Sequence, residues 1–219
     1  MTQNTSHAVM SQRHEAHDSL DHFPTPPWAT RALCEWLLRH DQPIASESVW
    51  EPACAEGHMS RALADYFAGV TSSDVYDYGY GRVHDFLWPD PLLNGSDWII
   101  TNPPFRLGEQ FASKALKIAR DGVALLVRTA FLESADRYES LYRDTPPSEV
   151  LQFVERVPMF KGRLDRHGST ATSYCWLVWR KRATAGTHFH WLAPCRKRLE
   201  RDSDYPSSLD LVRAAAVGQ

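Results

Sequence analysis

The sequence predicts an α/β fold built on a doubly wound, mostly parallel sheet of seven strands, with one antiparallel strand near its carboxyl-terminal end. Short apolar runs typical of buried strands alternate with segments of helical periodicity along the 219 residues. This alternation is the pattern of a parallel sheet with helices on both faces. The last two strand candidates have no helix between them, so one of them should run antiparallel.

The individual elements follow from apolar spacing. The strand candidates are residues 48–51, 69–75, 83–87, 97–102, 122–128, 149–156 and 172–179. Helical spacing predicts helices at residues 58–67, 108–120 and 133–143. A first helix should present Trp28, Leu33 and Trp36 to the core, with Thr25 as its cap and Pro26 at its first position.

The segment 51–57 joins the first strand candidate to a predicted helix. This is the layout of a ligand-binding crevice at the carboxyl end of a parallel strand. Gly57 can take a positive φ and open the helix amino terminus to a ligand. Glu51 lies at the strand tip, where a carboxylate repels phosphate but suits a cation or ribose hydroxyls. The loop therefore favours an adenosyl ligand with an amino group and a sulfonium.

Two further acids fit such a ligand. Asp74 ends the second strand candidate, 17 residues after Gly57, and an acid about 20 residues beyond such a loop commonly holds ribose hydroxyls. Asp85 can accept a hydrogen bond from an adenine amino group while Phe86 packs on the ring. Each acid alone is more often a solvated side chain, so the inference depends on their order along the chain.

Asn102-Pro103-Pro104-Phe105 is the most informative motif, and it follows the apolar run 97–101. The prolines fix φ and remove two backbone donors, which leaves the carbonyl groups free to accept hydrogen bonds. The Asn102 amide oxygen and the Pro103 carbonyl can accept both hydrogens of a planar amino group, and Phe105 can stack on its ring. The alternative is a proline-rich turn after a core strand.

The chain resembles the class I S-adenosylmethionine-dependent methyltransferases, and among them the amino-directed group related to DNA N6-adenine methyltransferases. The segments that carry the resemblance are Phe23–Trp28, Glu51–Gly57, Asp85–Phe86 and Asn102–Phe105. It implies a Rossmann-like fold and methyl transfer from S-adenosylmethionine to the N6 amino group of a flipped adenine in DNA. It implies catalysis by Asn102, Pro103, Pro104 and Phe105. It implies cofactor binding by Phe23, Thr25, Glu51, Pro52, Ala53, Gly57, Asp74, Asp85 and Phe86.

One residue departs from the family pattern, and other functions fit parts of the sequence. Ala55 stands where the family usually has glycine, which costs about 1–2 kcal/mol if the position requires a positive φ. An RNA methyltransferase acting on adenine N6 or guanine N2 is one alternative. A glutamine-directed protein methyltransferase, which usually has Tyr in place of Phe105, is another. A non-enzymatic module that binds a cofactor or nucleic acid is the third.

Positive charge is concentrated between residues 156 and 201. This segment has 11 Lys and Arg residues and 2 Asp and Glu residues, in a chain of net charge −3. A basic segment on an acidic body is typical of a polyanion-binding surface. We expect Phe160, Lys161, Arg163 and Arg166, in the loop between the last two strand candidates, to contact DNA or, alternatively, RNA.

The remaining sequence features are consistent with a soluble cytoplasmic enzyme without a metal ion. No apolar run approaches a membrane span, and the polar start of the chain lacks the apolar core of a secretory signal. The four cysteines show no C-x-x-C pairing, which suggests reduced thiols. The expected divisions are a disordered tail (1–20), a catalytic domain (21–182) and a basic carboxyl-terminal extension (183–219).

Overall fold

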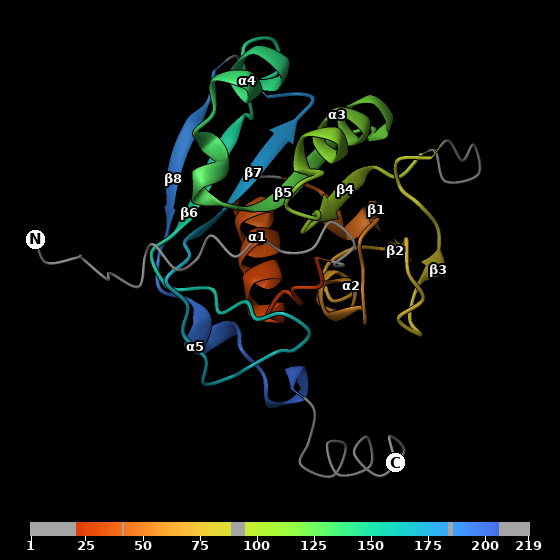
Figure 1. Cartoon of the computed structure of the whole chain (residues 1–219), viewed down its shortest axis with the longest axis vertical. Coiled ribbons are helices and arrows are strands. Elements are labelled where there is room, and N and C mark those ends of the chain that lie inside the picture. Colours follow the sequence, from red (N-terminus) through yellow and green to blue (C-terminus); the bar gives the residue numbers. More distant parts are fainter. Residues whose placement is uncertain (1–20, 41, 89–94, 184–185, 206–219) are drawn as a thin grey trace, which may run out of the picture.

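The computed structural model describes residues 21–40, 42–88, 95–183 and 186–205. Its centre is a sheet of eight strands in the order β3-β2-β1-β4-β5-β7-β6-β8 (Figure 1). The strands are β1 (Ser48–Glu51), β2 (Gly69–Asp74), β3 (Arg82–Val83), β4 (Trp98–Thr101), β5 (Gly122–Arg128), β6 (Glu149–Phe153), β7 (Tyr174–Arg180) and β8 (His188–Leu192). The helices are α1 (Pro27–Arg39), α2 (His58–Leu63), α3 (Gly108–Ile118), α4 (Ala135–Arg137) and α5 (Arg196–Leu199). Single turns are η2 (Ile44–Ser46), η4 (Thr129–Leu132), the π-helical η5 (Tyr138–Tyr142) and η6 (Asp202–Asp204).

The sheet is parallel except for β7, which runs antiparallel to both of its neighbours, β5 and β6. This confirms the predicted mostly parallel sheet with one antiparallel strand. No helix intervenes between β6 and β7, so the chain turns back beside the strand that it has just formed. The predicted count of seven strands is corrected to eight, because residues 188–192 form β8 and pair in parallel with β6.

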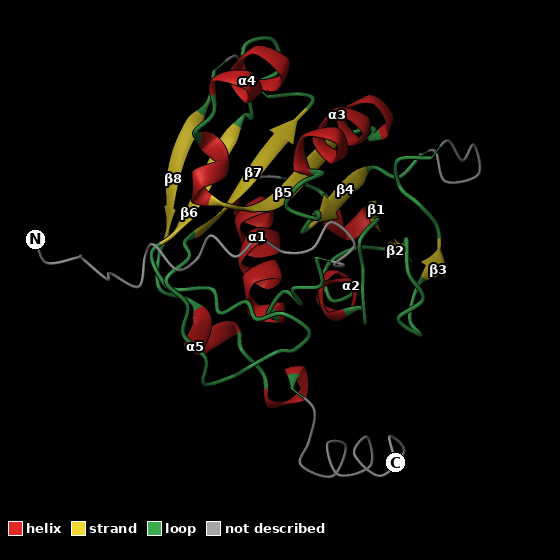
Figure 2. Cartoon of the chain, viewed as in Figure 1, coloured by secondary structure: helices red, strands yellow, loops and turns green. Residues whose placement is uncertain are grey.

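Helices cover both faces of the sheet, as Figures 1 and 2 show. One apolar cluster joins the sheet to α1, α2 and α5, and the other joins it to α3 and η5. The alternation along β5 explains this division. Ala124 and Leu126 belong to the first cluster, whereas Val123, Leu125 and Val127 belong to the second. A strand buried on both faces reads as a continuous apolar run, which is why it was predictable.

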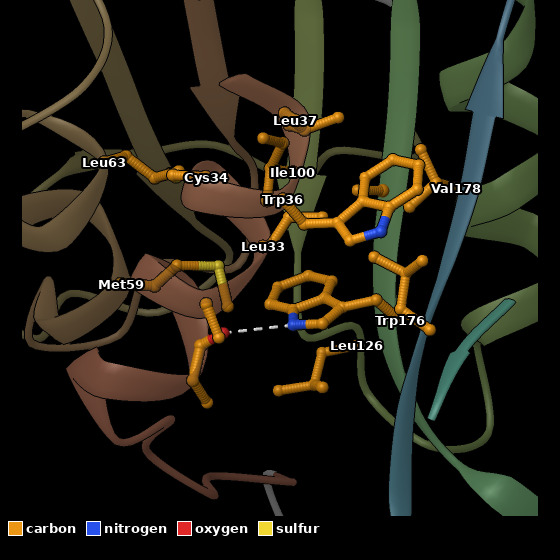
Figure 3. Close-up of a cluster of buried hydrophobic side chains, with 14 of the residues drawn as sticks. Leu33, Cys34, Trp36, Leu37, Met59, Leu63, Ile100, Leu126, Trp176 and Val178 are labelled. Carbon is orange, nitrogen blue, oxygen red and sulfur yellow. Dashed lines mark hydrogen bonds between the residues drawn. The ribbon is translucent and has the colours of Figure 1, made fainter. Parts of the chain in front are cut away.

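Trp176 of β7 is the centre of the α1 face (Figure 3). Leu33, Trp36 and Leu126 lie around it, and its indole N–H donates to the Ala29 carbonyl at 3.1 Å. The side chain is fully buried. A buried indole usually has such a partner for its N–H group, and the rest of the ring contributes apolar area. This contact fixes α1 against the sheet and so positions the residues that precede the helix.

Several predicted boundaries are corrected. α1 begins at Pro27, and Pro26 precedes it with ψ 126°, because a residue before proline is disfavoured in the helical region. Thr25 makes no capping hydrogen bond. The helix expected at 58–67 ends at Leu63, and the one expected at 133–143 is divided into α4 and η5. The strand expected at 83–87 is limited to β3.

Arg31 holds the carboxyl-terminal part of the described chain against α1. Its guanidinium donates to both carboxylate oxygens of Asp204, at 2.8 and 2.7 Å, and to the Leu199 carbonyl at 2.9 Å. The extension expected at 183–219 therefore contributes β8 to the sheet and α5 to its cover. The tail expected at 1–20 lies outside the described residues. None of the described helices has the length and apolar character that a membrane span requires.

Candidate active site

A cavity of about 210 Å³ lies at the carboxyl ends of β1, β2 and β4. The strand order reverses between β1 and β4, and ligands of open α/β sheets bind at such a switch point. Many of the residues expected in the site line this cavity: Phe23, Thr25, Glu51, Pro52, Ala53, Asp74, Asp85, Phe86, Asn102 and Pro104. The strand ends thus bring together residues from distant parts of the sequence.

The loop 52–57 contains two residues with left-handed backbone. Gly57 has φ 80° directly before α2, as predicted, and a side chain there would collide with the Tyr80 ring. Among the described residues, Ala55 alone combines a side chain with a positive φ, of 42°. Its N–H donates to Asp74 Oδ2 at 2.9 Å, which holds the residue in this conformation. The alanine that departs from the family pattern therefore occupies a position that favours glycine.

Glu51 ends β1 and is 2% exposed. Burial raises its pKa to about 8, because the charged carboxylate loses its hydration. The Ser60 hydroxyl on α2 donates a hydrogen bond to the carboxyl group and opposes this shift without cancelling it. This shift favours the protonated form of the group at neutral pH. A ligand with a positive charge or donor hydroxyls would favour its ionised form.

Asp74 ends β2 and both supports the loop and faces the cavity. Its carboxylate accepts hydrogen bonds from the Ala55 and Tyr76 N–H groups, at 2.9 and 3.2 Å. Burial raises the pKa of Asp74, and these hydrogen bonds oppose that shift. Because both oxygens already accept from the backbone, their direction is fixed before any ligand arrives.

Asp85 and Phe86 follow β3 and lie at different depths. The Asp85 side chain is exposed, and it accepts a hydrogen bond from the Leu87 N–H at 2.9 Å. Phe86 is 1% exposed and packs against Trp50 and Phe111, with ring centroids 5.1 and 4.8 Å away. Phe86 is thus a core residue that also lines the cavity, and Asp85 lies at the cavity mouth.

Asn102 directly follows β4 and has a fixed orientation. Its amide nitrogen donates to the Phe23 carbonyl at 3.0 Å. The opposite orientation would place two carbonyl oxygens against each other, so this contact assigns the two ends of the amide. The amide oxygen Oδ1 is buried and has no hydrogen-bond partner within the described part of the chain. Such an acceptor costs about 1–3 kcal/mol, and a donor on a ligand would recover that cost.

An amino-terminal strap, residues 21–25, connects the parts of the site. The Asp21 carboxylate accepts a hydrogen bond from the Phe105 N–H at 2.9 Å. His22 lies 2.7 Å from the Glu56 carboxylate and accepts a hydrogen bond from the Gly162 N–H through its carbonyl, at 2.8 Å. The strap therefore contacts the Asn102–Phe105 motif, the loop 52–57 and the segment expected to bind nucleic acid.

Three of the residues expected for catalysis or cofactor binding lie outside the cavity lining: Gly57, Pro103 and Phe105. Gly57 shapes the loop through its left-handed backbone, and Pro103 is buried. The Phe105 ring packs against Phe23, with 5.0 Å between centroids, and a guanidinium group covers it. One face of the ring that is expected to stack on a base is therefore covered in this structure.

The basic loop, residues 157–170, reaches the site from the β6–β7 connection. The Met159 sulfur lies 3.9 Å from the Asn102 amide nitrogen, and Gly162 contacts the strap. Phe160 forms an isolated bridge with Arg163, whose guanidinium carbon lies 5.3 Å from the centroid of the Phe160 ring. The loop thus places its aromatic and basic residues beside the strap.

Ion pairs reduce the positive charge that the sequence count indicates. Lys161 and Arg163 are exposed, and Arg163 lies 3.7 Å from Asp165. Arg166 pairs with Asp202 at 2.7 Å, so it is the least available of the expected contacts. Other cations of the segment also form ion pairs: Arg180 with Glu149, Arg182 with Asp121, Arg196 with Glu200, Arg198 with Glu35 and Arg201 with Asp65.

Sequence reasoning missed His22 and Tyr78, which both line the cavity and whose rings lie 4.7 Å apart. His22 directly precedes the motif that begins at Phe23, and Tyr78 belongs to the tyrosine-rich run 76–80. That aromatic run, directly after Asp74, was the available signal. Cys54 also lines the cavity, and burial raises its pKa to about 12, which disfavours a thiolate. The described residues contain no group of three or more potential metal ligands.

Solved structures that resemble this chain include bacterial and archaeal proteins. A Listeria monocytogenes protein assigned to the class I S-adenosylmethionine-dependent methyltransferases has a TM-score of 0.58 and 12% identity, over 95% of this chain and 74% of that one. A Pyrococcus horikoshii protein assigned as an RNA methyltransferase has a TM-score of 0.57 and 15% identity, over 80% and 95% of the two chains. The modification subunit assigned to a type I restriction enzyme of Vibrio vulnificus has a TM-score of 0.54 and 14% identity, over 95% and 55%.

The likeness is one of fold. No protein-family model matches the sequence, and no curated protein matches it either. Together with the strand order, the structural matches identify the chain as having the class I S-adenosylmethionine-dependent methyltransferase fold.

Proposed function

We propose that this protein transfers a methyl group from S-adenosylmethionine to the N6 amino group of a flipped adenine in DNA. The observation that carries the proposal is the Asn102 amide oxygen, which is buried, fixed in orientation and without a partner in the described residues. It matches the need of an exocyclic amino group for a hydrogen-bond acceptor. The motif that contains it has the composition expected of an amino-directed methyltransferase.

The acidic cavity suits the proposed cofactor. S-adenosylmethionine supplies an electrophilic methyl group on a positively charged sulfur. Glu51 and Asp74 would hold its hydroxyl and ammonium groups, and Asp85 would accept from its adenine. The cavity volume of about 210 Å³ is below the roughly 300–1,000 Å³ of pockets for drug-sized ligands. The cavity would therefore have to widen for the cofactor to bind.

The chemistry needs acceptors more than a strong base. Asn102 Oδ1 and the Pro103 carbonyl accept the two amino hydrogens, which makes the nitrogen lone pair available. S-adenosylmethionine would supply the methyl group: the nitrogen would bond to the methyl carbon as the methyl–sulfur bond breaks, with that electron pair left on sulfur. The amino proton becomes acidic during this step and leaves to water. The fixed dipole of the Asn102 amide would face the developing positive charge and need no reorganisation.

A nucleic acid is the favoured substrate because the basic loop adjoins Asn102 and the strap. A base inside a duplex hides its amino group, so the target must be extruded. Adenine is favoured over cytosine because the resembling enzymes that act on cytosine N4 more often begin this motif with Ser. DNA is favoured through the same resemblance.

Product identification tests this proposal. The protein is incubated with isotopically labelled S-adenosylmethionine and with single-stranded DNA, duplex DNA, RNA or a glutamine-containing peptide. We expect label in N6-methyladenine from DNA, at least as readily from single strands, since unstacking costs a few kcal/mol less there. Label in N4-methylcytosine, in RNA alone or in the peptide would contradict the proposed substrate. Absence of cofactor binding in calorimetry at millimolar concentration would contradict the methyltransferase itself.

A further inference from the structure

Arg128, the last residue of β5, covers the ring that is expected to stack on the target base. Its guanidinium carbon lies 3.7 Å from the centroid of the Phe105 ring. This falls within the roughly 3.5–4.0 Å of optimal contact between stacked carbon atoms, so a base and the guanidinium cannot share the face. In the structure, a cation therefore covers one face of the ring on which the target base is expected to stack.

The contacts of Arg128 are weak enough to be exchanged. In the described part of the chain, they are the Phe105 ring and Tyr174, the cross-strand neighbour in β7. Burial raises the pKa of the Tyr174 hydroxyl, and Arg128 opposes that shift. No carboxylate of the described residues pairs with the exposed Arg128 side chain. A cation–π contact at an exposed site changes an equilibrium by only about 2–5-fold.

Charge gives a second reason for the guanidinium to leave. The target nitrogen becomes positive as its bond to the methyl carbon forms, and a neighbouring cation would oppose that change. A flipped nucleotide also brings an anionic phosphate, for which a guanidinium is a strong bidentate partner. The substrate thus removes one partner of Arg128 and provides a better one.

On the basis of the proposed function, we propose that Arg128 shields the Phe105 ring in the free protein and moves to a phosphate of the target nucleotide when the base stacks on that ring. Arg128 is then a positioning residue on a rigid strand. Its role differs from that of the basic loop, because stacking of the base on Phe105 and binding of the nucleic-acid phosphate both depend on the same side chain. The inference predicts opposite effects of Arg128 on ligands with and without phosphate.

The test measures binding of two ligands that contain 2-aminopurine, a fluorescent analogue of adenine that is quenched by stacking. One is the free 2-aminopurine deoxyriboside, and the other is a single-stranded oligonucleotide that contains the same base. With Arg128→Ala, the nucleoside should bind about 2–5-fold more tightly, because no cation competes for the ring. The oligonucleotide should bind more weakly, and the slope of its affinity against salt should fall by about 1.

Two variants serve as controls. Arg128→Lys keeps the charge and should restore the salt slope of the wild-type protein. Arg120→Ala removes an equally charged group that precedes β5, at the opposite end of the strand, where it is 64% exposed and lies 3.6 Å from Asp97. Arg120→Ala should leave the nucleoside affinity unchanged. Its salt slope should lie closer to the wild-type value than the salt slope of Arg128→Ala does.

Parallel changes for the two ligands in Arg128→Ala would overturn the proposal, and so would no change in either. Lack of oligonucleotide binding by the wild-type protein would overturn it as well. Because the readout is binding, it does not depend on turnover. If the protein methylates no nucleic acid, the proposed function is contradicted. Opposite changes in the affinities of the two ligands would still support the role of Arg128.

Discussion

Ala55→Gly should make the protein more stable, although it removes a side chain. Ala55 has φ 42°, a conformation that costs an alanine about 1–2 kcal/mol relative to glycine. Glycine gains conformational freedom in the unfolded chain, which offsets about 0.4–1 kcal/mol of this. The hydrogen bond from the residue 55 N–H to Asp74 is retained, since it comes from the backbone. The net expectation is a gain of about 0.5–1 kcal/mol in the free energy of unfolding.

Thermal unfolding measures this gain. For a chain of this size, it corresponds to a Tm increase of about 1–4 °C. Ala53→Gly is the matched control, because Ala53 lies in the same loop without a positive φ and should lose about 0.4–1 kcal/mol. If both variants lose stability to the same extent, the backbone at Ala55 is not strained and the reasoning fails.

Two further predictions concern charge. Burial holds the pKa of Glu51 near 8, so its protonated form stabilises the fold below the unfolded pKa of about 4.5, and this stability is lost as the pH rises through 8. Relative to the wild-type protein, Glu51→Gln should therefore gain up to about 1.4 kcal/mol per pH unit in that window, measured by denaturant unfolding; a constant difference would refute the burial argument. Neutralising Lys161 and Arg163 together should lower the salt slope of oligonucleotide binding by up to about 2. Neutralising Arg166, which is paired with Asp202, should lower the salt slope less. A larger effect of Arg166 than of Lys161 and Arg163 together would show that the basic loop faces elsewhere.

Strands with both faces buried were predictable from sequence, and the edge of the sheet was not. β4 and β5 are almost entirely apolar, and tertiary packing agrees with their local pattern. β8 alternates His188 and His190 with Phe189 and Trp191, a pattern that only its pairing with β6 distinguishes from a surface segment. Thr25 does not cap the first helix as predicted, because the two prolines that follow it place the start of the helix at Pro27.

The gathering of the expected site residues around one cavity was predictable, but their contacts were not. Parallel strands bring their carboxyl ends to one edge, so the order of Glu51, Asp74 and Asn102 was sufficient to gather them in one cavity. The orientation of Asn102 depends on the Phe23 carbonyl, 79 residues away. The contact of Arg128 with the Phe105 ring depends on β5 ending at Arg128. Contacts of this kind require the register of the sheet, which no local pattern contains.

The central claim is that Asn102 Oδ1 accepts a hydrogen bond from the target amine. Asn102→Ala should retain micromolar cofactor affinity in calorimetry and lose most turnover, because the interaction strengthens in the transition state. Thr101→Val is the matched control, since the adjacent Thr101 hydroxyl is also buried without a partner in the described residues but lies outside the cavity lining. The account predicts near wild-type turnover for Thr101→Val and a large loss for Asn102→Ala at unchanged cofactor affinity. Near wild-type turnover of Asn102→Ala would contradict it.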